Sequence, residues 1–130
     1  MKKEFVSPQQ GFSHLAKVTA NGVTTIYVAG QVGWAAGASE AGGDIAEQAE
    51  IAFTNVLKRL AEVGASASDI VKTNVYIKDI DPERVRAAGG AQARVFQLDP
   101  SPVSTWVGVT GLVYPQLLIE VEATAVVEAD

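Results

Sequence analysis

Two glutamates near the end of the chain are spaced so that both could act on one ligand. Residues 117–123 read LLIEVEA, in which Glu120 and Glu122 alternate with apolar residues. Alternation with a period of two is typical of a β-strand, where residues two apart share a face. The two carboxylates either meet solvent and cross-strand partners or look into a cleft. In a cleft, one of them could hold a water molecule or transfer a proton.

Few other residues offer chemistry. His14 is the only histidine, which excludes a multi-histidine metal site and leaves it as an acid–base group or a hydrogen-bonded edge residue. Ser104 and Thr105 bring hydroxyl groups to a second β-rich stretch, although such residues are common in ordinary strands. A serine hydrolase built from Ser13 or Ser104 beside His14 would lack a nucleophile-elbow motif.

A glycine-rich loop over 33–43 holds one large side chain, Trp34. Its glycines have neither the Walker spacing nor the dinucleotide-binding spacing, so we do not interpret it as a phosphate site. Trp34 either lines a binding site or covers the apolar patch of its own loop.

Composition limits the class of function. The 130 residues are 48% hydrophobic, enough for a single domain over 1–130 with a sizeable core. The net charge of −5 disfavours nucleic acid, and the lack of cysteine excludes disulfides and thiolate chemistry. No segment reaches the ~18 apolar residues of a membrane span, and the first residues lack a secretory pattern. We expect a cytoplasmic protein that binds no membrane and uses neither metal nor cofactor.

The elements that must position these residues follow a clear order. Hydrophobic periodicity predicts an edge strand over 12–18, strands over 24–32, 70–78, 102–109 and 117–125, and two helices that begin at Asp44 and Asp81. Asn21-Gly22 predicts a hairpin turn between the first two strands. The glycines at 89–90 predict a kink or an early end of the second helix.

This order, β-β-α-β-α-β-β, predicts an α+β fold in which one mixed sheet carries both helices on one face. The other face would then expose many apolar side chains to water. We therefore expect a homo-oligomer of closed symmetry, with a site at the junction between subunits.

Three segments resemble motifs of the RidA/YjgF family, also known as RutC-like proteins. Residues 27–31 (YVAGQ) resemble its second strand, 62–66 (EVGAS) together with 69–76 (DIVKTNVY) its helix-to-strand signature, and 119–125 (IEVEATA) its last strand. The resemblance runs over nearly the whole chain. It implies a chorismate-mutase-like fold and a homotrimer with a small-molecule cleft between each pair of neighbouring subunits.

In the best-understood branch of that family, the clefts hydrolyse 2-imino or 2-enamino acids to 2-keto acids and ammonia. The resemblance places Glu120 at the position of the glutamate that holds the attacking water. An arginine in a Pro-Arg-Ser motif holds the substrate carboxylate there, but this chain reads PVS, with Val103 in its place. Valine cannot make the two charge-assisted hydrogen bonds of a guanidinium. Phe12 stands where the deaminase branch has a tyrosine.

These departures predict a cleft rebuilt for a less anionic or more aromatic metabolite. We expect ligand contacts from eight residues: Phe12, His14, Gly30, Trp34, Arg94, Val103, Ser104 and Thr105. Arg94 is the cation considered as a substitute for the missing arginine, and a solvated helix residue is its alternative interpretation. The main hypothesis is a metabolite-binding trimer; the alternatives are an imine deaminase, which is a hydrolase, and a ribonuclease or translation inhibitor, which the acidic charge disfavours.

Overall fold

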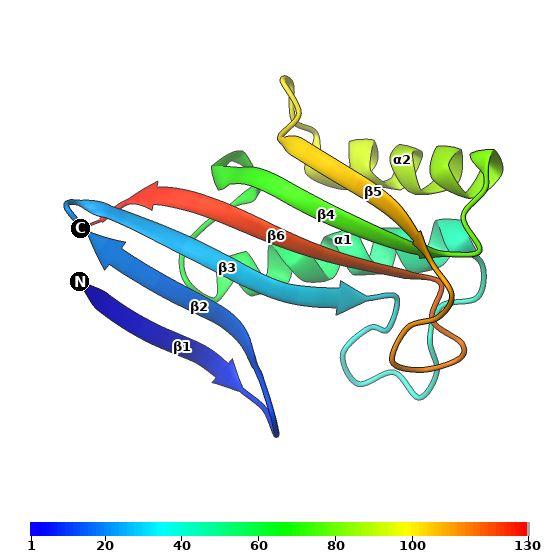
Figure 1. Cartoon of the computed structure of the whole chain (residues 1–130), viewed down its shortest axis with the longest axis horizontal. Helices are drawn as coiled ribbons and strands as arrows, with labels where there is room; N and C mark the ends of the chain where they lie inside the picture. Colours follow the sequence, from blue (N-terminus) through cyan, green and yellow to red (C-terminus); the bar gives the residue numbers. More distant parts are fainter. Residues whose placement is uncertain (130) are drawn as a thin grey trace.

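A computed structural model describes residues 1–129 (Figure 1). Its strands are β1 (Lys2–Pro8), β2 (Ser13–Ala20), β3 (Val23–Val32), β4 (Ile70–Lys78), β5 (Val103–Val109) and β6 (Ile119–Glu128). Its helices are α1 (Ile45–Ala61) and α2 (Pro82–Phe96), with a short 3-10 turn, η1 (Ala67–Asp69), before β4.

The strands form one six-stranded sheet in the order β1-β2-β3-β6-β4-β5. Only β4 and β5 pair in parallel, and the other neighbours are antiparallel. Both helices cover the same face of the sheet, with α1 packed against β3, β6 and α2 (Figure 1). The expected α+β architecture with a mixed sheet and two helices is therefore confirmed.

The edge of the sheet differs from expectation. Residues 2–8 form an additional strand, β1, so β2 lies inside the sheet and not at its edge. The segment KKEFVSP begins with three charged residues and lacks a clean alternation, which is why its pattern did not predict a strand. Charged side chains are common on edge strands, where they discourage pairing with other chains.

Local signals placed the turns and helix starts correctly. Asn21 and Gly22 have φ angles of 53° and 78°, the left-handed values that a tight type I′ hairpin turn requires. The side chains of Asp44 and Asp81 cap the two helices by accepting hydrogen bonds from the backbone three residues further on. Helix α2 continues through Gly89 and Gly90 to Phe96, so the predicted early end was wrong.

The core lies between the sheet and the helices. Phe53 of α1 is fully buried and packs edge-on against Phe96 of α2, with ring centroids 5.2 Å apart. The buried residues of β3 and β6 point toward the same layer, for example Ile26 and Val121. Within residues 1–129, no helix is long and apolar enough to cross a membrane.

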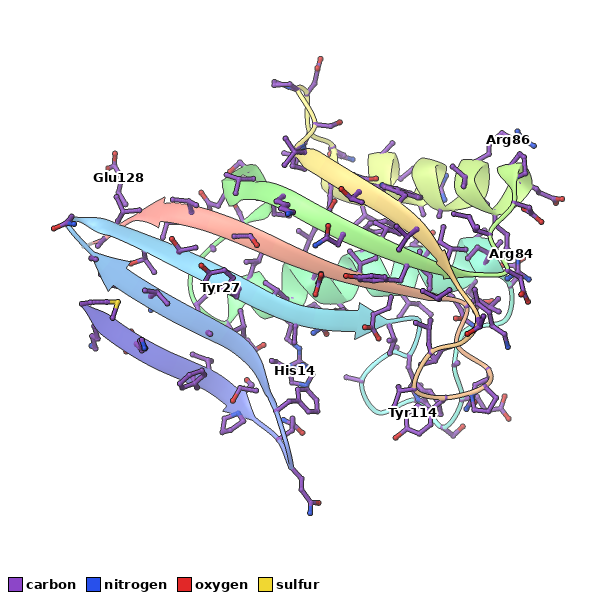
Figure 2. The ribbon with its side chains drawn as sticks, viewed as in Figure 1. His14, Tyr27, Arg84, Arg86, Tyr114 and Glu128 are labelled. Carbon is purple, nitrogen blue, oxygen red and sulfur yellow. The ribbon has the colours of Figure 1, made fainter. Side chains whose placement is uncertain are left out.

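The face of the sheet without helices is called here the open face. It presents large apolar side chains to solvent: Phe5, Phe12, Tyr27 and Val103 are exposed by 67%, 52%, 50% and 68%. Tyr27 stands on this face near the middle of β3 (Figure 2). An exposed apolar surface of this kind marks a site for another protein or a ligand.

Candidate functional site

Glu120 lies on the open face at the centre of the sheet's width. It is in β6, opposite Val32 of β3 and Tyr76 of β4. The pairing of β3 with β6 shifts register between Val28 and Gln31, which is a β-bulge that contains Gly30. A Cβ atom at Gly30 would overlap the carboxylate of Glu120. The glycine therefore leaves the space that this side chain fills.

The surroundings of Glu120 favour its protonated form. Burial raises the pKa of its carboxyl group, and the negative charge of nearby Glu122 raises it further. Within the described part of the chain, no side chain donates a hydrogen bond to this carboxylate or forms an ion pair with it. A carboxylate without these partners can accept a proton or orient a water molecule.

Glu122 is on the same face, as its spacing predicted, but its contacts are different. Its Oε1 atom accepts a hydrogen bond from Asn74 Nδ2 at 2.8 Å and another from the Tyr76 hydroxyl at 2.7 Å. The hydrogen bond to Glu122, followed by burial and the charges of both glutamates, raises the pKa of Tyr76. Asn74 and Tyr76 thus hold one glutamate in place, while the other stays free.

A hollow of about 740 Å³ lies on the open face. Aromatic residues of the β1–β2 hairpin and β3 line one side, namely Phe5, Phe12 and Tyr27. Polar residues of β4 and β6 line the other side, namely Lys72, Asn74, Glu122 and Thr124. Glu120 does not line this hollow and lies beyond it, toward the end of β3.

Val103 and Thr105 of β5 face the same side as the glutamates. Val103 is in register with Lys72 of β4, and Thr105 is in register with Asn74. Lys72 also lines the hollow, so the cation beside Val103 is a lysine of the neighbouring strand. Sequence reasoning missed this residue because the parallel pairing of β4 and β5 could not be deduced from spacing.

Ser104 and Arg94 point elsewhere. The Ser104 hydroxyl bonds to Thr73 Oγ1 at 2.7 Å and accepts a hydrogen bond from Trp106 Nε1 at 2.7 Å. Because Thr73 is buried on the helix-covered face, Ser104 lies on that side of the sheet and lines a small hollow beside α2. Arg94 projects from α2 and forms an exposed ion pair with Glu50 of α1. Within one chain, neither residue approaches Glu120.

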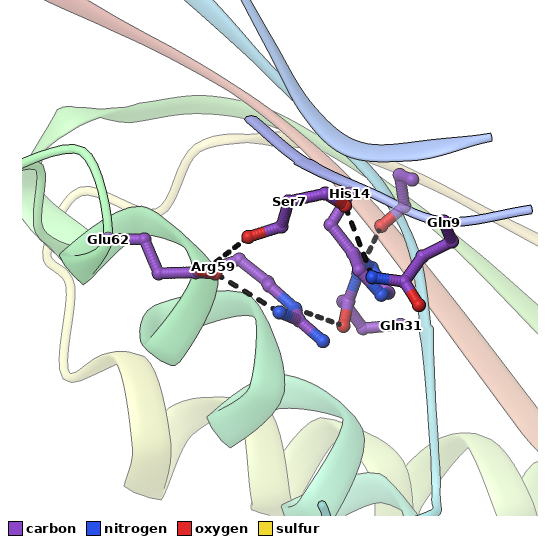
Figure 3. A network of polar contacts seen from close by, with 7 residues as sticks. Ser7, Gln9, His14, Gln31, Arg59 and Glu62 are labelled. Atoms are coloured by element: carbon purple, nitrogen blue, oxygen red, sulfur yellow. Dashed lines mark hydrogen bonds and ion pairs between the residues drawn. The ribbon is translucent and has the colours of Figure 1, made fainter. Parts of the chain in front are cut away.

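His14 belongs to a polar network that joins the β1–β2 hairpin to α1 (Figure 3). Gln31 Nε2 lies 3.2 Å from His14 Nδ1, and Gln31 Oε1 accepts a hydrogen bond from Arg59. Arg59 also pairs with Glu62, which accepts a hydrogen bond from Ser7. Burial and then the positive charge of Arg59 lower the pKa of His14, against a smaller opposing effect of Glu62.

Two loops meet at the end of β3 and the start of β6. The Trp34 indole nitrogen donates to Ala38 O within its own loop, and its ring tilts against Tyr114, with centroids 6.0 Å apart. Tyr114 stands in the loop that precedes β6 (Figure 2). Buried Gln48 of α1 joins both loops, because it donates to Gly42 O and Gln116 O and accepts from Leu118 N.

The structure therefore brings Glu120, Gly30, Val103, Thr105 and Phe12 to the open face. Sequence reasoning did not assign Asn74, Tyr76 or Tyr114 to the site, although Asn74 and Tyr76 lie two residues apart in the strand predicted over 70–78 and therefore share a face. In the described part of the chain, no cluster of three or more acidic or histidine side chains could hold a metal ion. The candidate site is thus built around a carboxylate, Glu120, on the open face of the sheet. The chain that carries it has a small α+β fold.

Comparison with known proteins extends this description. The family model described as Endoribonuclease L-PSP matches residues 3–127. The 2-iminobutanoate/2-iminopropanoate deaminase of Dermatophagoides farinae is 32% identical over 105 residues, which are 80% of this chain and 79% of that protein.

Solved structures show the same relationship. Rv2704 of Mycobacterium tuberculosis, a member of the YjgF/YER057c/UK114 family, is 31% identical with a TM-score of 0.76, covering 97% of this chain and all (100%) of that one. TdcF of Escherichia coli with bound serine has a TM-score of 0.76 over 90% of this chain and 88% of its own, at 23% identity, which is a likeness of fold. The chain belongs to the YjgF/RidA family.

Proposed function

We propose that this chain forms a homotrimer and binds a small metabolite at Glu120, in clefts that neighbouring subunits complete. The observation that carries the proposal is the state of Glu120: a half-buried carboxylate over Gly30, with a raised pKa and no donor among residues 1–129. An unpaired carboxylate in such a place destabilises the fold, because burial removes part of the solvation of its charge. A functional role would explain why the chain has one there. Perturbed carboxyl groups of this kind concentrate at functional sites.

The open face supports assembly. Its exposed Phe5, Phe12 and Tyr27 lie around the hollow and present their rings to solvent. Packing against a second copy would bury these rings, and cyclic symmetry is the usual way for identical chains to do so. The wall that Glu120 lacks within one chain would then come from the neighbouring subunit.

The residues on this face favour a ligand that does not depend on a guanidinium. Val103 cannot clamp a carboxylate, and Lys72 offers a single ammonium group beside it. Phe12 and Tyr27 offer aromatic surface. We therefore propose a small metabolite that is less anionic or more aromatic than a simple imino acid.

Hydrolysis of an imine is the second candidate, favoured by the relative from Dermatophagoides farinae that is named as an imine deaminase. In this reaction, Glu120 accepts a proton from water as the oxygen attacks the C=N carbon. Glu120 passes this proton to nitrogen, which gives an amino alcohol. The hydroxyl proton of this intermediate then also moves to nitrogen as the C–N bond breaks, so that a carbonyl compound and ammonia leave. No cofactor is needed, since one water molecule balances the reaction.

The test measures ammonia release from 2-imino acids generated in situ, with wild type, Glu120→Gln and Val103→Arg in parallel. Activity in the wild type that Glu120→Gln abolishes would establish the second candidate and contradict our preference for a different ligand. Activity gained only by Val103→Arg would support a deaminase scaffold altered at one position.

Assembly and binding need their own measurements. Sedimentation velocity should give the mass of three chains of 13.6 kDa each. Titration of the ¹⁵N-labelled protein with aromatic and aliphatic 2-keto acids should shift the amide signals around Glu120, and more strongly for the aromatic compounds. A monomer in sedimentation velocity whose amide signals do not shift with any of these compounds would overturn the proposal.

The family description also names an endoribonuclease. A net charge of −5 disfavours binding to a phosphate backbone, so we do not propose RNA cleavage. Binding of a fluorescent single-stranded RNA at low salt would contradict this choice.

A further inference from the structure

The side chain of Glu122 is held in place by hydrogen bonds, yet the proposed reaction assigns it no role. Glu122 Oε1 accepts two hydrogen bonds, from the amide of Asn74 and the hydroxyl of Tyr76. Both groups donate to this oxygen. The amide nitrogen of Asn74 can act only as a donor, and the hydroxyl of Tyr76 has one hydrogen to donate. An oxygen that accepts two such bonds is typical of an ionised carboxylate.

The register of the strands makes this arrangement selective. Asn74 stands directly opposite Glu122, so its hydrogen bond runs straight across the strand pair. Tyr76 stands directly opposite Glu120, yet its hydroxyl bonds to Glu122. The Tyr76 hydroxyl thus bonds to the neighbouring carboxylate, and no other side chain of residues 1–129 donates a hydrogen bond to Glu120.

The other charged groups on this face do not cancel the charge of Glu122. Strand β4 contributes Lys72, beside Val103 and Thr124, and Lys78, whose Nζ donates to Pro115 O. Strand β3 contributes Tyr27, and the open face of β5 carries only Val103, Thr105, Val107 and Val109. Among residues 1–129, no ion pair includes Glu120 or Glu122. The negative charge of Glu122 therefore acts on Glu120 through a partly buried surface.

We infer that Glu122, held by Asn74 and Tyr76, is a positioning residue that makes Glu120 a stronger proton acceptor for its water molecule. This inference rests on the proposed function of Glu120. Two carboxylates two residues apart on one face repel each other, so they do not ionise easily at the same time. When the hydrogen bonds of Asn74 and Tyr76 keep Glu122 ionised, the repulsion raises the pKa of Glu120. In line with this, the pKa of Glu120 is raised by burial first and by the charge of Glu122 second. A base works best when its pKa lies near the pH of the reaction.

The test titrates the side-chain carboxyl carbons of glutamate by ¹³C NMR, without substrate, in wild type and Glu122→Gln. Glutamine keeps a carbonyl oxygen that can accept both hydrogen bonds but removes the charge. The Glu120 signal, assigned with Glu120→Gln, should then titrate at lower pH. Glu128→Gln is the matched control, because Glu128 lies in the same strand but at the far end of the sheet (Figure 2). An equal midpoint in wild type and Glu122→Gln would overturn the inference.

A second readout follows Tyr76 through the ¹³Cζ signals of the three tyrosines, which Tyr76→Phe assigns. The pKa of Tyr76 is raised chiefly by its hydrogen bond to Glu122. It should fall in Glu122→Gln, because a neutral amide oxygen accepts a weaker hydrogen bond than a carboxylate and carries no charge, and stay unchanged in Glu128→Gln. A tyrosine that titrates alike in all three proteins would show that the clamp does not exist in solution, and the inference would fail.

These titrations separate the inference from the reaction on which it builds. If Glu122→Gln lowers the Glu120 midpoint but no imine is hydrolysed, the coupling stands and only the reaction is lost. If the protein hydrolyses imines, the acid limb of its pH–rate profile should move to lower pH in Glu122→Gln. Hydrolysis with an unmoved acid limb would contradict the coupling and leave the reaction intact.

Discussion

The two faces of the sheet, built from the same strands, differ in how far their side chains find partners within the chain. On the helix-covered face, buried polar groups are all bonded: Gln48 makes three hydrogen bonds, Gln31 bonds to two other side chains, and Thr73 pairs with Ser104. Within residues 1–129, no buried side-chain nitrogen or oxygen lacks a partner. On the open face, aromatic rings are exposed, and no side chain of residues 1–129 donates a hydrogen bond to Glu120. One face completes its polar contacts within the chain, whereas the other leaves groups exposed that the proposed assembly and ligand would contact.

The largest effect is expected in the core of the helix-covered face. Phe53→Ala removes a fully buried ring and its edge-on contact with Phe96, and should lower the free energy of unfolding by about 3–5 kcal/mol. Urea denaturation followed by circular dichroism measures this. Val113→Ala, at a side chain 73% exposed, is the control and should change little. Similar losses in both variants would mean that the buried layer is not the main source of stability.

The second effect concerns assembly through the open face. Tyr27→Lys places a charge among the exposed rings and should leave mostly single chains in sedimentation velocity, while the circular dichroism spectrum stays that of a folded protein. Val85→Lys adds the same charge at an exposed position of α2 and should not alter the mass. If Tyr27→Lys keeps the wild-type mass, the open face is not the contact between subunits.

A smaller effect is expected from the pH dependence of Glu120. Its folded-state pKa lies above the ordinary 4.5, so the folded chain favours the protonated form. Stability from this group is present below that value and is lost as the pH rises through the folded pKa. Glu120→Gln should therefore be more stable than wild type at neutral pH. The difference in stability should vanish as the pH falls below the ordinary glutamate pKa of 4.5.

Thermal unfolding at several pH values measures this difference. Because glutamine retains the size of the side chain above Gly30, packing should not account for it. A variant less stable than wild type at neutral pH would indicate that the carboxylate has a stabilising partner in the assembled protein.

The smallest effect has the opposite sign and comes from His14. Burial and then Arg59 lower its folded-state pKa below 6.5, so the folded chain favours the neutral ring. The stability it contributes is present above that value and is lost as the pH falls through the folded pKa. His14→Gln should weaken the loss of stability on mild acidification, as measured by urea denaturation in steps of pH. An identical pH dependence in both proteins would remove His14 from the explanation.

The sequence predicted the features that depend on neighbours in the chain. Asn21-Gly22, Asp44 and Asp81 act within a few residues, and each formed the predicted turn or cap. Strand β1 was missed because its charged residues suit an edge strand but do not alternate. Its position depends on pairing with β2 and not on its own pattern.

The candidate site was only partly accessible to the same reasoning. Alternation placed Glu120 and Glu122 on one face, because a strand fixes side-chain direction locally. The clamp on Glu122 was not predicted, since Asn74 and Tyr76 lie 48 and 46 positions away in the chain. Spacing does not reveal that β6 inserts between β3 and β4, so their meeting depends on contacts between distant segments.

The three hydrogen bonds of Gln48 have a consequence for motion. This one buried side chain of α1 holds the loop that carries Trp34 through Gly42 and the loop that carries Tyr114 through Gln116 and Leu118. Neither loop can move far from the end of the sheet without breaking a bond to the same amide. The two loops should therefore fluctuate together, so that a substitution in one loop changes the flexibility of the other.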